Sequence, residues 1–125
     1  HRCLRPGGRI ILTVPFAARW HYIPHDYWRL TPSGLRLLLE RGGFDDVVVH
    51  GRGNEWTVAC CKLMAPLLSF ALPQSAPGAI RVHPRALLTA PLIFVLAALA
   101  NLSLRGRAGD DCLGYTTFAV RPVER

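Results

Sequence analysis

The chain has 125 residues, 50% of them hydrophobic, and a mean hydropathy of +0.22. These values exclude a disordered segment, which would contain too few apolar side chains to form a core. The net charge is +7, and 14 of the 15 basic residues are arginines. The arginines stand singly, without the basic runs and interleaved aromatic residues of single-strand binders, so we expect no nucleic-acid partner. The positive charge would suit an anionic membrane surface.

The first predicted element is a strand at residues 9–14. A Pro-Gly-Gly turn at residues 6–8 precedes it, and Pro15 ends it because proline cannot donate a hydrogen bond to a neighbouring strand. The strand sequence RIILTV is apolar without alternation, which predicts burial on both faces, Ile10 and Ile11 included. Because ligands of open α/β sheets bind beyond the carboxyl ends of the strands, functional residues are expected just after this strand.

Residues 17–30 form a predicted loop that is rich in aromatic and titratable side chains. It is either an ordinary packed loop or one wall of a substrate pocket. His21 and His25 are four residues apart, but Pro24 disfavours the helix that would direct both to one metal ion, so no metal site is expected. Either histidine could act as a general base, since imidazole titrates near neutral pH, and Asp26 could orient one of them.

A helix is predicted after this loop. Thr31 is a favourable N-cap, Pro32 suits the first helical position, and Gly42 marks the end. The leucines expected on its apolar face are Leu35, Leu38 and Leu39. We assign this helix a structural role only.

Two further strands are predicted. Residues 45–50 contain three consecutive valines, which again predicts burial on both faces. Residues 115–120 (YTTFAV) form a last strand that Arg121 and Pro122 end.

Two apolar segments, residues 56–72 and 86–104, lie between these strands, joined by a connector at residues 73–84 that contains Pro, Gly and Ser. The second segment holds no charge, and as a helix it would be about 28 Å long, close to the thickness of a bilayer core. If the flanking strands share a sheet, the segments cross a membrane twice or not at all, and Lys62 makes the first crossing costly. The alternatives are helices packed against the protein, a hairpin on a membrane surface, and a re-entering pair.

Three stretches carry a resemblance to a known family: RCLRPGGRIILTVPF (residues 2–16), HDYWRLTP (25–32) and LLLERGGF (37–44). Together they resemble the carboxyl-terminal half of class I S-adenosylmethionine-dependent methyltransferases. In that family an L-x-P-G-G turn enters the fifth strand, a helix ending in Gly-Phe leads to the sixth, and an antiparallel seventh strand closes the sheet. The resemblance implies an α/β fold with a partial Rossmann-like sheet (strands 5, 6 and 7) and an apolar helical insertion between the last two strands.

The resemblance also implies a function, methyl transfer from S-adenosylmethionine to a small-molecule or lipid-like acceptor. The residues expected to face the acceptor are His21, His25, Asp26 and Tyr27. The family's Gly-rich cofactor loop and its acidic partner are absent, and the chain begins without methionine. We therefore expect a fragment, inactive alone, whose parent protein binds the cofactor mainly through a missing amino-terminal half, with no cofactor-binding residue in this chain.

The expected organisation is a carboxyl-terminal part of the methyltransferase core at residues 1–55, an apolar helical insertion at 56–108, and a closing strand and tail at 109–125. The alternative function is a non-catalytic module that binds a membrane surface or a partner through the apolar hairpin. The four cysteines form no C-x-x-C pair, which favours reduced thiols and a cytoplasmic protein, located at the membrane surface if the hairpin binds there.

Overall fold

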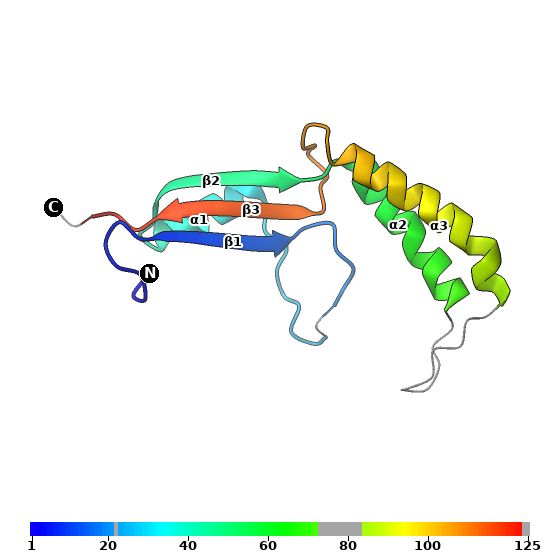
Figure 1. Ribbon diagram of the computed structural model, residues 1–125. Helices are drawn as coiled ribbons and strands as arrows, with labels where there is room; N and C mark the ends of the chain where they lie inside the picture. The colour runs from blue at the N-terminus through cyan, green and yellow to red at the C-terminus, as the bar shows by residue number, and fades with distance from the viewer. Residues whose placement is uncertain (22, 73–83, 124–125) are drawn as a thin grey trace.

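The computed structural model describes residues 1–21, 23–72 and 84–123. Its elements follow in the order β1 (Arg9–Pro15), α1 (Pro32–Arg41), β2 (Asp45–Arg52), α2 (Glu55–Ala71), α3 (Pro84–Ser103) and β3 (Gly114–Val120). The strands form one sheet with α1 beside it, and α2 and α3 lie side by side and extend beyond one end of the sheet (Figure 1). The predicted mixture of helices and strands is confirmed.

The sheet has the order β1-β3-β2, and its central strand β3 is antiparallel to both neighbours. β1 and β2 are therefore parallel to each other, and α1 makes the crossover that a parallel connection requires. In the register, Thr117 of β3 is paired with Leu12 on one side and with Val49 on the other. The strand predicted nearest the end of the sequence thus lies in the middle of the sheet.

The ends of α1 follow the predicted capping residues. Thr31 Oγ1 accepts a hydrogen bond from the Gly34 N–H at 3.1 Å, and Pro32 occupies the first turn, where its missing N–H costs nothing. The helix ends at Gly42, and Gly43 follows with φ +82°, a conformation that glycine adopts without strain.

The core lies between α1 and one face of the sheet. It consists of two clusters, Leu35 with Cys112 and Tyr115, and Leu39 with Phe44 and Ala119. Leu38 was expected on the same apolar face, but it is 54% exposed. It lies about 100° around the helix from Leu39, which places it at the edge of the contact with the sheet.

The second face of the sheet differs from the prediction. Burial of β1 and β2 on both faces is wrong for the described residues, because Ile11 is 67% exposed and Val48 46% exposed. Side chains of a strand alternate between faces, so Ile10 is half-buried toward α1 while Ile11 points the other way. Phe118 of β3 lies between Ile11 and Val48 on that second face, and none of the described helices covers it.

α2 and α3 form a helix hairpin, and among the described elements they contact only each other. At its base, Asn54 caps α2 in a capping box with Thr57, and Thr57 Oγ1 lies 2.5 Å from Ser103 Oγ at the end of α3. The two apolar segments predicted from the sequence are thus confirmed as helices, whereas residues 73–83 of the connector lie outside the described residues. α3 is long and apolar enough to cross a membrane, and only 17% of its 18-residue apolar stretch is buried inside the protein.

Candidate functional site

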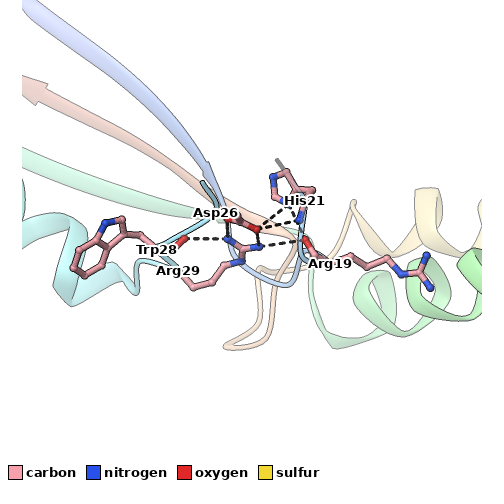
Figure 2. A network of polar contacts seen from close by, with 5 residues as sticks. All are labelled: Arg19, His21, Asp26, Trp28 and Arg29. Carbon is pink, nitrogen blue, oxygen red and sulfur yellow. Dashed lines mark hydrogen bonds and ion pairs between the residues drawn. The ribbon is translucent and has the colours of Figure 1, made fainter. Parts of the chain in front are cut away.

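The loop that follows β1 is held by a network around Arg29 and Asp26 (Figure 2). The Arg29 guanidinium donates to both carboxylate oxygens of Asp26, with Nη2 to Oδ2 at 2.6 Å. It also donates to the carbonyl oxygens of Trp28 at 3.0 Å and of Arg19 at 3.2 Å. Arg29 therefore ties the far end of the loop to the part that leaves the sheet.

This network sets the ionisation of Asp26. The hydrogen bonds from Arg29, followed by the one from the His21 backbone N–H, hold the pKa of Asp26 well below its usual range. Its side chain is only 9% exposed. Asp26 therefore stays ionised and bonded at neutral pH, which suits a residue that positions the loop better than one that removes a proton.

His21 is the sequence-predicted candidate that the network orients. Its backbone N–H donates to Asp26 Oδ2 at 3.1 Å, and its ring Nδ1 lies 2.7 Å from the carbonyl oxygen of Arg19. Because a carbonyl can only accept, Nδ1 carries the proton in the neutral ring, and Nε2 keeps the lone pair. The side chain is 52% exposed, so Nε2 is accessible to a ligand.

His25 and Tyr27 form a second pair in the same loop. His25 Nδ1 lies 3.0 Å from the Tyr27 hydroxyl, and the two rings meet edge to face. Tyr27 is 70% exposed. The structure thus divides the four predicted site residues into two pairs, His21 with Asp26 and His25 with Tyr27.

A cavity of about 530 Å³ lies between this loop and the hairpin. Its lining residues are Ala17, Ala18, Arg19, Cys61, Lys62 and Ala65. Figure 2 shows the Arg19 side chain extending away from the network toward α2. No described residue forms an ion pair with the Arg19 guanidinium or the Lys62 ammonium. The cavity therefore presents two cations to any ligand that enters it.

The sequence interpretation missed the roles of three cations. Asp26 and Arg29 are three residues apart, a spacing that could have indicated their ion pair. Arg19 and Lys62 are far apart in the chain, so no local signal could have placed them at one cavity. The sequence could show only that Lys62 is the single charge in its apolar segment.

The described residues offer neither a metal site nor a pocket suited to S-adenosylmethionine. They contain no group of three or more His, Cys, Asp or Glu side chains that could hold a metal ion. S-adenosylmethionine carries positive charge on its sulfonium and amino groups, whereas the cavity supplies two cations and Asp26 is already bonded to Arg29. The described residues therefore do not form the binding site of that cofactor.

Comparisons of the chain with protein-family models, with curated proteins and with solved structures find no match.

Proposed function

We propose that this chain forms the acceptor-side part of an S-adenosylmethionine-dependent methyltransferase that acts on a small-molecule or amphiphilic acceptor. The observation that carries the proposal is the path of the chain from the L-x-P-G-G turn at residues 4–8 through β1 and α1 to the Gly-Phe step and β2. The antiparallel direction of β3 agrees with the closing strand that the resemblance implies.

The turn before β1 supports this proposal because both of its glycines are needed. Gly7 has φ +74°, a conformation that other residues adopt only with strain. A Cβ on Gly8 would lie 2.7 Å from the carbonyl oxygen of Arg5. The same turn bonds to the residue after β3, with the Gly7 N–H donating to Arg121 O and the Arg121 N–H donating to Gly8 O. The turn is therefore held against the residue that follows the central strand.

In this proposal His21 is the general base. Its Nε2 would remove the proton from a hydroxyl group of the methyl acceptor, while Asp26 and Arg29 hold the loop in place. S-adenosylmethionine, bound outside the residues described here, would supply the methyl group. Positioning of the acceptor is expected to contribute most of the acceleration, because methyl transfer is an in-line displacement.

The test is a radiolabelled methyl-transfer assay on the natural protein as its gene encodes it, with hydroxylated amphiphiles as acceptors. His21→Gln should lower kcat by about 10²-fold or more, the usual contribution of a general base, with little change in KM. His50→Gln is the matched control and should keep most of the activity, because His50 is an exposed histidine of β2 outside the loop. Failure of the natural protein to bind S-adenosylmethionine would end the proposal.

A second function, attachment to a membrane, is favoured by a separate observation. Only 17% of the apolar stretch of α3 is buried, and the hairpin contacts no other described element. An apolar surface of this extent on a soluble domain usually marks an interaction site. Flotation of the whole chain with lipid vesicles tests this function independently of any methyl transfer.

A further inference from the structure

We propose that the hairpin lies in the plane of an anionic membrane, with the outer side of α3 among the acyl chains and the Lys62 side of α2 facing the headgroups. This inference rests on the membrane attachment proposed above and adds its orientation and lipid charge. It does not depend on the proposed methyl transfer.

The outer side of α3, which points away from its buried residues, is apolar. The helix carries no charge after Arg85. Its buried residues, Thr89 and Ala100, are three turns apart and define one narrow side. Large side chains that are at least half exposed point in the other directions: Leu87, Leu88, Phe94, Val95, Leu99 and Leu102. At about 100° per residue they cover more than a third of the circumference, wider than the seam of a coiled coil. Lipid fits such a surface better than a second helix does.

α2 gives the hairpin its polar side. Three of its four buried residues, Thr57, Cys60 and Ala71, lie on one side, and the contact of Thr57 Oγ1 with Ser103 Oγ shows that this side faces α3; the fourth, Val58, is buried near the base on the other side. Lys62 follows Cys60 by two residues, which places it about 200° around the helix and directs it away from α3. There it lines the cavity with Arg19. The hairpin as a unit is therefore amphipathic, although α3 by itself is not.

The positions of the cations favour a hairpin that lies in the membrane over one that crosses it. From Lys62 to the end of α2 at Ala71 is about 14 Å, roughly half of a bilayer core. A crossing hairpin would draw Lys62 and the neighbouring Arg19 into the hydrocarbon, and Arg85, which stacks on the Phe70 ring at 5.1 Å, would have to pass through it. An in-plane hairpin keeps these cations at the level of the lipid phosphates.

The test measures partitioning of the whole chain onto vesicles of phosphatidylcholine alone and of phosphatidylcholine with phosphatidylglycerol. We expect stronger binding to the phosphatidylglycerol vesicles. Each of Arg19→Gln and Lys62→Gln should weaken that binding about fivefold and leave binding to phosphatidylcholine alone unchanged, since a cation at an anionic surface contributes about that factor.

A matched pair of neutral substitutions tests the orientation. Phe94 is 75% exposed on the outer side of α3, and Phe94→Gln should weaken partitioning about thirtyfold, which corresponds to the apolar burial of one phenylalanine. Ser69 is exposed and lies two turns from Lys62 on the same side of α2, so Ser69→Gln should change partitioning less than twofold. Circular dichroism should show that both variants remain helical.

Each other result overturns a stated part of the inference. Equal weakening by both substitutions would mean that both sides meet lipid, as in a crossing hairpin, and would refute the orientation while membrane attachment stands. No effect of Phe94→Gln would refute the assignment of α3. Absence of wild-type partitioning would refute membrane attachment itself. If the protein were instead a dimer that Phe94→Gln dissociates, the outer side of α3 would be a contact between copies.

Discussion

The side chain of Leu35 offers a direct test of how α1 packs on the sheet. Leu35 is 0% exposed and contacts Cys112 and Tyr115, whereas Leu38, three residues later on the same helix, is 54% exposed. Both residues are leucines of one helix, so replacing either of them by alanine changes the intrinsic helix propensity by nearly the same amount. Their substitution therefore separates burial from all effects of helix formation.

The expected magnitudes follow from that difference. Leu35→Ala removes fully buried methyl and methylene groups and leaves a cavity, which should lower the free energy of unfolding by about 3 kcal/mol. Leu38→Ala removes a side chain that is mostly in water, so the change should be about 0.5 kcal/mol or less. A small domain has a total stability of only about 5 kcal/mol, so the first change is large enough to be unmistakable.

Urea denaturation followed by far-ultraviolet circular dichroism is the suitable assay. Tryptophan fluorescence would report poorly on this core, because Trp20, Trp28 and Trp56 are all more than 60% exposed. A shift of the midpoint without a change of slope is required to interpret the result as a change in stability. Equal destabilisation by the two substitutions, or a larger effect of Leu38→Ala, would refute the packing of α1 described here.

Three further predictions concern the turn, the loop and the core. Gly8→Ala should destabilise the protein by about 1–3 kcal/mol in urea titration, because the added Cβ would meet Arg5 O at 2.7 Å. Asp26 should contribute stability above about pH 4, its usual pKa, and lose it as the pH falls toward its lowered pKa, so Asp26→Asn should flatten the acid side of the stability profile. Burial, together with the Cys112 thiol, raises the pKa of Tyr115 to about 12. Stability should therefore fall as the pH rises from about 10, where the unfolded tyrosine ionises first, and Tyr115→Phe should remove that part of the fall.

Local signals in the sequence predicted the elements of this fold well. The capping residues of α1 and the prolines that flank the strands act within a few residues of where they stand, so element boundaries followed from them. The apolar runs also predicted two helices, since both segments are too long for strands. The sequence did not predict correctly which faces of the strands are covered by other elements. The sequence of β1 shows that Ile11 is apolar, but whether another element lies over it depends on distant parts of the fold.

The candidate site could be predicted only in part for a similar reason. The loop after β1 was identified from its place at the carboxyl end of a strand, and the pairing of Asp26 with Arg29 lies within reach of sequence spacing. The cavity between Arg19 and Lys62 was not predictable, because it depends on how the hairpin extends beside the loop. The direction in which Lys62 points depends on which side of α2 contacts α3, and the sequence does not show this.

The central place of β3 has a consequence for how the chain is made. β1 and β2 are synthesised before β3, which is their only hydrogen-bonded partner among the described strands, so the hydrogen bonds between these three strands form only after residues 114–120 are made. Until then the described part of the growing chain exposes the strand edges that β3 later pairs, together with an apolar hairpin, and both features promote aggregation. A chaperone or a membrane that takes up the hairpin early would protect the nascent protein until β3 is made.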